Sequence, residues 1–429
     1  MTTLAPWYDA RRVADKKSVV LSKWLHQRPG GADRAGLTPV TLIPNKTPAT
    51  GRRSYAAAQV NRLTQGWSTI SASANSDIHR SLDAVRARSR KLANDDEYVK
   101  KWLAMVTTNV VGPAGFRFQS RVYDQPGKPD TLANDAIERA WERFGRKGVC
   151  DVTGRQSLIG LQQLAIKAAA RDGEFMFQIV RGKAAGNPFG IALQMLDIDR
   201  LDTGYNQPAT QGANAIRMGV EVNAYGRPVA YWLKGSHPGE AYQINLGYQE
   251  NARQRIPAED IIHEFISDRP EQVRGMPWAH AAMLRLNNLG GYEEAAVIAA
   301  RVGASKMGFF TTPDGQAAPV STGTEDGTAD AALTMDADPG VFQSLPEGVN
   351  FQPFNPDYPT AMYADFVKAN LRGVASGLGV AYHALANDLE GVSFSSIRSG
   401  TLEERDAWML IQEWFAQSFL DRVHAEFMQ

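Results

Sequence analysis

Residues 277–303 read Pro-Trp-Ala-His-Ala-Ala-Met-Leu-Arg-Leu-Asn-Asn-Leu-Gly-Gly-Tyr-Glu-Glu-Ala-Ala-Val-Ile-Ala-Ala-Arg-Val-Gly. The leading proline is typical of a helix's first turn and predicts one helix over residues 278–303, roughly 39 Å long at ~1.5 Å per residue. The pair Gly290-Gly291 costs ~1 kcal/mol per residue relative to alanine. The small side chains would let neighbouring helices approach closely, with a kinked core helix as the alternative. The alanines expected at this contact are Ala295, Ala296, Ala299 and Ala300.

The composition changes after this helix. Gly, Thr, Asp and Pro crowd residues 304–357, which indicates a module inserted between two helices. Its short strand candidates are residues 307–310, 341–343 and 350–354. Lys306 is its only basic residue. Its acidic residues are Asp314, Glu325, Asp326, Asp330, Asp336, Asp338, Glu347 and Asp357.

The helical pattern resumes over residues 360–376 and is broken by Gly377 and Gly379. Residues 381–392 are predicted to form a polar loop. The last long helix is expected over residues 393–427, where apolar side chains recur at helical spacing.

The segments before residue 277 mix helices with strands, which predicts an α+β fold. Residues 1–65 are basic and irregular, and are expected to form a solvated arm or an arm lying on a neighbouring subunit or nucleic acid. Helices are expected at residues 76–111, 131–144 and 158–170. Strands are expected at residues 116–122, 174–180, 191–196, 216–222, 229–233 and 261–266, with a hairpin turn at 223–227.

The composition excludes several classes of protein. The 46 Lys and Arg residues balance 46 Asp and Glu residues, so bulk charge cannot hold DNA tightly. The single cysteine, Cys150, allows no intrachain disulfide and suits a reducing cytoplasm. The N-terminus has no signal-peptide pattern, and the most apolar stretch, residues 295–300, is too short to span a bilayer. We expect a protein made in the cytosol, without a membrane partner.

Motifs for catalysis are missing. The sequence has no phosphate-binding Gly-x4-Gly-Lys-Ser/Thr loop and no nucleophile elbow. His263-Glu264 begins like a zinc-protease helix, but Ser267 stands where the second histidine is required and the pattern is that of a strand. Asp172-Gly-Glu174 is interpreted as a turn between a helix and a strand. We therefore predict no catalytic residues, no metal, no cofactor and no enzymatic activity.

Four stretches, taken in order, resemble a known family. They are residues 94–141 with Asn109-Val-Val-Gly-Pro-Ala-Gly, Ala170-Arg-Asp-Gly-Glu-Phe, the block from Ile261-Ile-His263 to Arg274-Gly-Met-Pro277, and Gly391-Val-Ser-Phe-Ser-Ser-Ile-Arg-Ser. In this order and spacing the chain resembles the portal proteins of tailed double-stranded-DNA phages, in their lambda-like branch, over residues 60–429. Phe394 stands where the family often has tyrosine.

The resemblance implies an architecture. It consists of a basic arm (1–60), a wing (61–275), a first stem helix (276–303), a clip (304–357), a second stem helix (358–376), a tunnel loop (377–394) and a long helix leading towards a crown (395–429). The tunnel loop would face DNA through His383, Asn387, Asp388, Glu390 and Ser393. The clip would dock partners through Asp326, Asp330 and Asp336.

The same resemblance implies a function. The chain would form a homo-oligomeric ring, expected to be dodecameric, at one capsid vertex of the virion after assembly in the host cytoplasm. Double-stranded DNA would pass through it during packaging and ejection, and its partners would be the terminase large subunit, a head–tail connector and the major capsid protein. The alternatives are another minor capsid or adaptor component of a phage and a nucleic-acid-processing enzyme, which would need a metal-binding carboxylate cluster.

Overall fold

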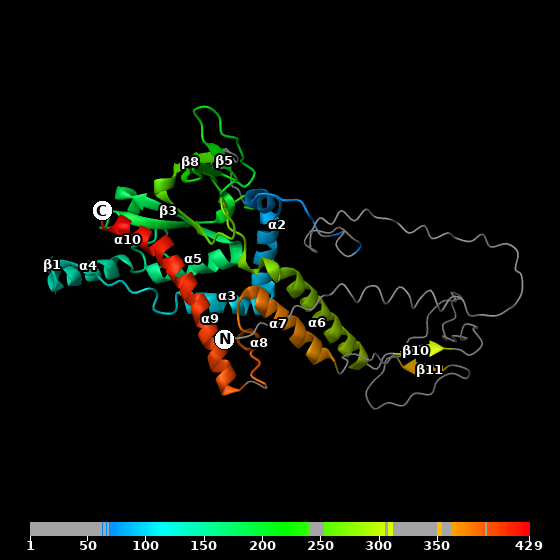
Figure 1. The fold of residues 1–429 in the computed structure, drawn as a ribbon. Helices are drawn as coiled ribbons and strands as arrows, with labels where there is room; N and C mark the ends of the chain where they lie inside the picture. Colours follow the sequence, from blue (N-terminus) through cyan, green and yellow to red (C-terminus); the bar gives the residue numbers. More distant parts are fainter. Residues whose placement is uncertain are drawn as a thin grey trace, which may run out of the picture. The chain divides into compact units, whose positions relative to one another are not determined.

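The computed structural model describes residues 62, 66, 68–240, 253–304, 308–311, 350–353, 362–390 and 393–429. The chain divides into two units, residues 1–70 and 71–429, and every helix and strand below belongs to the second. The fold mixes helices with antiparallel sheets, as the predicted α+β class requires (Figure 1). Among the described helices, none is long and apolar enough to cross a membrane.

Two helices, α2 (Ala74–Asp95) and α3 (Glu97–Val110), replace the single helix predicted over residues 76–111. The prediction was wrong at Asp96, whose extended backbone ends α2. The Asp96 side chain accepts a hydrogen bond from the Val99 N–H and so caps the start of α3.

Helices α4 (Thr131–Phe144) and α5 (Leu158–Asp172) confirm the second and third predicted helices. The predicted strand over residues 116–122 is wrong. That segment instead bonds to the side of α4, because Glu138 and Asn134 accept the N–H groups of Ser120 and Val122. The nearby hairpin is short, with strands β1 (Tyr123–Gln125) and β2 (Lys128–Pro129).

Two antiparallel sheets follow. The first has the order β4-β3-β9 and the second the order β5-β6-β7-β8. The strands are β3 (Glu174–Arg181), β4 (Ile191–Leu196), β5 (Ala215–Arg217), β6 (Val220–Val222), β7 (Pro228–Lys234), β8 (Arg253–Pro257) and β9 (Ile261–Phe265). Short 3-10 turns lie at Gly182–Ala185, Ile198–Arg200 and Ala258–Asp260.

Within these two sheets, the strand predictions hold except in two places. The strand expected over residues 216–222 is two strands, because Met218 and Gly219 have φ of 50° and 82° and reverse the chain there. Strand β8 was not predicted, because most of its side chains are exposed and polar. The expected hairpin turn is confirmed, with the Asn223 side chain accepting the N–H groups of Tyr225 and Arg227.

The remaining chain is mostly helical. A 3-10 turn (Trp278–Ala281) leads into α6 (Met283–Ala304), so the predicted long helix begins with a tighter turn and then runs through Gly290-Gly291. Strands β10 (Gly308–Thr311) and β11 (Asn350–Pro353) pair antiparallel, as two of the three strand candidates predicted, and the third lies outside the described residues. Helices α7 (Tyr363–Leu378), α8 (Tyr382–Ala386), α9 (Phe394–Phe415) and α10 (Asp421–Phe427) follow, with a π-helical turn (Ala416–Leu420) joining the last two.

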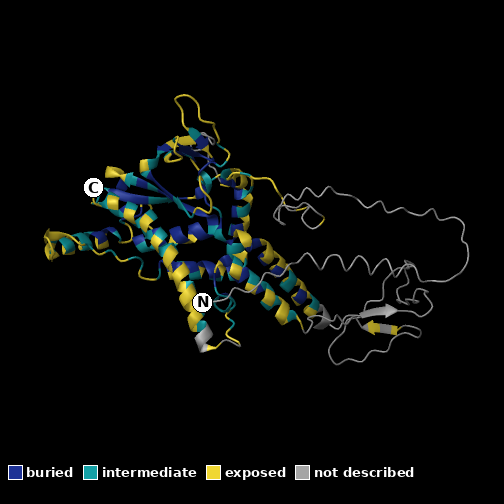
Figure 2. Cartoon of the chain, viewed as in Figure 1, coloured by how far each residue is buried: buried dark blue, intermediate teal, exposed yellow. Residues whose placement is uncertain are grey.

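The core joins the parts of the second unit. One buried cluster combines side chains of α3, α5, β3, the base of α6 and α7, and α9 to α10. Aromatic rings pack the π-helical turn before α10 against β3. The ring centroid of Phe419 lies 4.9 Å from that of Phe177 and 5.7 Å from that of Phe175. A second cluster lies between α2 and the four-stranded sheet. Figure 2 shows that α5 and β3 are deeply buried while much of α6 and α9 remains exposed.

Candidate functional site

Helices α6 and α7 form an antiparallel pair, called the helix pair below. Their facing residues run in opposite order along the two helices: Ala282 lies near Gly377, and Tyr292 lies near Tyr363 and Phe366. A Cβ on Gly377 would lie 3.2 Å from the Ala282 Cβ, so glycine permits this close approach. The base of the pair belongs to the main core cluster, which contains Leu286 of α6 and Val374 of α7 (Figure 1).

The four alanines predicted to pack between subunits do not share one surface. Ala296 is only 4% exposed within the single chain. Ala299 is half-buried, whereas Ala295 and Ala300 are exposed. The chain's own fold therefore encloses Ala296, and the other three alanines remain available for the predicted contact.

The linking segment, residues 379–390, joins α7 towards α9 and is more ordered than the predicted polar loop. It contains the short helix α8, and it reverses direction at Gly379 and Asn387, whose φ values are 68° and 55°. Leu385 is 1% exposed and belongs to the main core cluster. The prediction of a polar loop over residues 381–392 was wrong here, because the buried Leu385 side chain holds α8 against the core.

Polar contacts hold the linking segment to α7 and α3. The Asp388 carboxylate accepts hydrogen bonds from Lys368 Nζ at 2.9 Å and from the Tyr382 hydroxyl at 2.8 Å. The bond from Lys368 lowers the pKa of Asp388 to about 2. The Asn387 side chain accepts a hydrogen bond from Lys101. Lys368 neutralises the charge of Asp388, which is one of the two carboxylates of the segment.

The other predicted site residues are spread more widely. Asn387, Glu390 and Ser393 are exposed, and His383 is half-buried. Glu390 is the one carboxylate of the linking segment without an ion pair in the described part of the chain. The predicted docking residues Asp326, Asp330 and Asp336 lie outside the described residues.

A buried charge cluster escaped the sequence interpretation. It consists of Arg86, Glu174, His263 and Arg274, whose side chains are each at most 2% exposed. Glu174 contacts Arg86 at 2.6 Å, Arg274 at 2.7 Å and His263 at 2.9 Å. It also accepts the Gly275 N–H at 2.9 Å. The residue taken as one end of a turn is therefore the centre of an ion-pair network.

The network sets the charge state of its members. Burial alone would raise the pKa of Glu174, but the charge of Arg274 and the hydrogen bond from His263 hold this pKa far below its ordinary value. Burial lowers the pKa of His263, so the neutral ring donates its Nε2–H to Glu174. One signal in the sequence could have indicated this cluster. Glu174 begins the apolar strand Glu174–Arg181, and a carboxylate that is buried with such a strand requires a charged partner.

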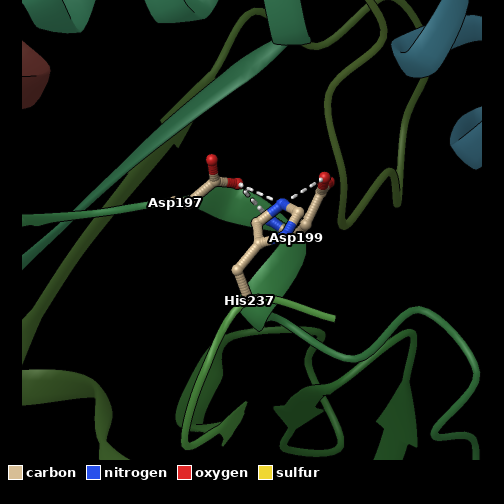
Figure 3. Close-up of side chains that lie close together, drawn as sticks. All are labelled: Asp197, Asp199 and His237. Atoms are coloured by element: carbon tan, nitrogen blue, oxygen red, sulfur yellow. Dashed lines mark hydrogen bonds and ion pairs between the residues drawn. The ribbon is translucent and has the colours of Figure 1, made fainter. Parts of the chain in front are cut away.

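Asp197, Asp199 and His237 form the one described group whose ligand atoms are close enough to hold a metal ion (Figure 3). His237 Nε2 lies 3.1 Å from an Asp199 oxygen and 3.8 Å from an Asp197 oxygen. Arginines already occupy both carboxylates: Arg86 and Arg90 bind Asp199, and Arg90 also binds Asp197. These cations would repel a metal ion, so the group extends the ion-pair network.

Comparison with known proteins gives a consistent result. A family model described as "Phage portal protein, lambda family" matches residues 60–412. A protein of Halomonas phage phiHAP-1 named "Probable portal protein" is 35% identical over 402 residues, which cover 93% of this chain and 76% of that protein.

Solved structures that align with this chain come from gene transfer agent (GTA) particles. A chain from the neck of an empty GTA particle aligns with a TM-score of 0.42 and 13% identity, over 79% of this chain and 82% of that one. A chain from the virion of a native gene transfer agent particle aligns with a TM-score of 0.42 and 14% identity, over 79% of this chain and 81% of that one.

Proposed function

The chain belongs to the lambda family of phage portal proteins, and we propose that its ring is the channel through which double-stranded DNA enters and leaves the capsid. As a member of this family it is a structural component of the virion, acts within an oligomeric ring and is not an enzyme. The finer assignments concern three regions: residues 61–275 as the wing, the helix pair as the stem, and the linking segment as the main part of the tunnel loop.

The observation that carries the proposal is the charge compensation of the linking segment. A channel must guide DNA without binding it tightly, because each phosphate neutralised by Lys or Arg adds salt-dependent affinity. Lys368 is paired with Asp388, so its charge is compensated, and Lys101 is held by a hydrogen bond to the neutral Asn387 side chain. The whole chain is likewise balanced, with 46 basic and 46 acidic residues.

Residues 304–357 are proposed as the clip that docks other proteins. Their acidic composition suits partners with basic faces, which we infer to be the terminase large subunit during packaging and the head–tail connector afterwards. We assign contact with the major capsid protein to the outside of the ring. Replacing Asp326, Asp330 and Asp336 with asparagine should weaken connector binding in pull-down assays while rings still form. Binding that is unchanged across a salt titration would contradict this role.

DNA packaging by charge-reversed rings tests the channel assignment. The substitutions Asp388→Lys and Glu390→Lys would place two new cations beside Lys368 and turn the segment into a phosphate clamp. We expect these rings to assemble and to package DNA at least tenfold more slowly at low salt, with partial recovery as salt increases.

The matched control places the same charge change elsewhere. Asp124 and Glu142 are exposed residues of the proposed wing, and Asp124→Lys with Glu142→Lys should leave packaging unchanged. Full-rate packaging at low salt by the Asp388→Lys, Glu390→Lys rings would place the linking segment away from the DNA path.

A further inference from the structure

We propose that an exposed seam on α6 packs against a matching ridge on α9 of the next copy of this chain, and that this contact closes the ring. The inference rests on the proposed function, because it names the partner surfaces that the ring would use. Both surfaces belong to described residues of the same chain, and they are different surfaces, as the contact of a cyclic ring requires.

The seam on α6 has the spacing of a helix–helix contact. Leu284, Asn288, Gly291, Ala295 and Ile298 follow one another at intervals of 4, 3, 4 and 3 residues, which places them along one stripe. All five are exposed, with Leu284 74% and Ile298 51% accessible. The stripe therefore carries two large apolar ends and a small centre, and the chain itself does not cover it.

Gly290 and Gly291 have no role within the single chain. A Cβ on either residue would meet no heavy atom within 4 Å. Glycine inside a helix nevertheless costs ~1 kcal/mol relative to alanine. Its presence at the centre of an exposed stripe is explained if a helix from outside the chain approaches this backbone closely.

The seam borders a groove of about 1090 Å³ between α6 and the α2–α3 junction. Leu92 and Tyr98 supply apolar surface to the groove, while Asp96, Glu97 and Glu293 supply acidic groups. Burial raises the pKa of Glu293, and the neighbouring charges of Glu97 and Asp96 raise it further. Arg88, Lys91 and Arg301 also line the groove, but in the described part of the chain none of them pairs with these carboxylates. The lining carries five carboxylates, Asp95, Asp96, Glu97, Glu293 and Glu294, against these three cations, so the groove is acidic on balance and suits a basic, partly apolar ridge.

Helix α9 provides such a ridge. Arg398, Leu402, Arg405 and Met409 follow one another at intervals of 4, 3 and 4 residues and are all exposed. Leu402 and Met409 are 53% and 44% accessible. In the described part of the chain neither arginine has an ion pair. The two arginines alternate with the two exposed apolar side chains along the ridge, and together they complement the acidic groove and the apolar ends of the seam.

Charge reversal and its rescue test the contact by native mass spectrometry. Arg398→Glu with Arg405→Glu should reduce the ring fraction at least tenfold, and so should Glu97→Lys with Glu293→Lys. Thermal unfolding of each variant chain should match that of the wild type, which separates a lost contact from a weakened fold. The four changes combined should restore rings. Glu403→Arg, on another face of α9, should assemble like the wild type.

A size substitution gives an independent readout. Gly291→Leu should also reduce the ring fraction at least tenfold, whereas Ala136→Leu on the exposed side of α4 should not. If wild-type chains form rings and the reversed, rescued and Gly291→Leu variants all assemble equally well, this contact is wrong and the proposed function stands. If wild-type chains form no rings under any condition that supports packaging, the proposed function itself fails.

Discussion

The sheet region (residues 71–275) and the helix pair differ in whether their charged and apolar groups are buried or exposed. In the sheet region the charge cluster is internal, and four residues from three segments converge on the fully buried Glu174. In the helix pair and the adjoining linking segment, ion pairs such as Lys368–Asp388 lie near the surface, and side chains as large as Leu284 and Ile298 remain exposed. The fully buried charges of the first region find partners within it, whereas the second region leaves large apolar side chains exposed.

The difference separates residues that stabilise the single chain from residues that we propose to act in assembly. A buried carboxylate that loses its partners, or leaves them unpaired, is costly to the fold. An exposed seam of apolar and glycine residues contributes little to one chain but much to a contact between chains. Changes in the sheet region should therefore lower subunit stability, and changes on the outer face of the helix pair should alter the ring.

The largest expected effect is at Glu174. Glu174→Gln leaves Arg274 buried without its counter-charge and removes one of the two carboxylates that pair with Arg86, so it should lower the free energy of unfolding by about 3–5 kcal/mol. Denaturant titration, at a protein concentration too low for ring assembly, measures this loss of stability. Glu221→Gln is the matched control, because its partner Arg255 is 45% exposed, and should cost about 1 kcal/mol or less. Equal losses in the two variants would contradict the distinction between the regions.

The junction between the sheet region and the helix pair should be the next most sensitive point. Gly173 has φ 93°, and a Cβ there would lie 2.6 Å from the Pro277 nitrogen. Gly173→Ala should therefore cost about 2–4 kcal/mol, from left-handed strain and steric overlap together. Gly186 has φ 67° and open space around it, so Gly186→Ala should cost only about 1–2 kcal/mol. Thermal unfolding of the two variants compares them, and an equal cost would remove the close contact from the explanation.

The pH dependence of stability should reveal a buried carboxylate without a counter-charge. Burial raises the pKa of Glu264 to about 7. The folded state then holds this proton while the unfolded state releases it, so Glu264 destabilises the fold increasingly as pH rises from about 4.5 to 7. Glu264→Gln should stabilise the subunit by about 1–3 kcal/mol at pH 8, at ~1.36 kcal/mol per pKa unit, and by almost nothing at pH 4.

The control for that measurement is Glu259→Gln. Glu259 is exposed, so its replacement should leave the free energy of unfolding unchanged from pH 4 to pH 8. A Glu264→Gln effect that is constant across this range would show that the Glu264 carboxyl group has the same pKa in the folded and unfolded states.

The sequence predicted the elements better than their boundaries and partners. Helix α4 and strand β4 match the predicted ranges, since apolar periodicity and turn residues mark both clearly. The break at Asp96 was missed because one capping side chain interrupts an otherwise continuous helical pattern. Strand β8 was missed because it is polar and depends on its neighbour β7 for hydrogen bonds.

The site was harder to predict, for a physical reason. Asp388 and Lys368 are 20 positions apart in sequence, and only the fold brings them within 2.9 Å. Likewise Glu174 and Arg274 meet through tertiary packing, although both stood in stretches that carried the family resemblance. Motif order could indicate the family, but it could not show which charges neutralise one another.

The smallest expected effect distinguishes two faces of α6. Ala296 is 4% exposed inside the chain, so Ala296→Leu should overpack it and cost about 1–3 kcal/mol of subunit stability. Ala300 is exposed, so Ala300→Leu should change subunit stability by less than about 0.5 kcal/mol. Denaturant titration at low protein concentration checks both values. A larger loss for Ala300→Leu would mean that the two faces of this helix are assigned the wrong way round.

Cryo-electron microscopy of the purified full-length protein tests the central claim most directly. The account predicts closed rings with an axial channel, with residues 379–390 at its narrowest part and the α6 seam of each subunit against α9 of the next. A population of compact monomers, or rings in which residues 379–390 lie on the outer rim, would contradict the assignment of this chain as a ring-forming DNA channel.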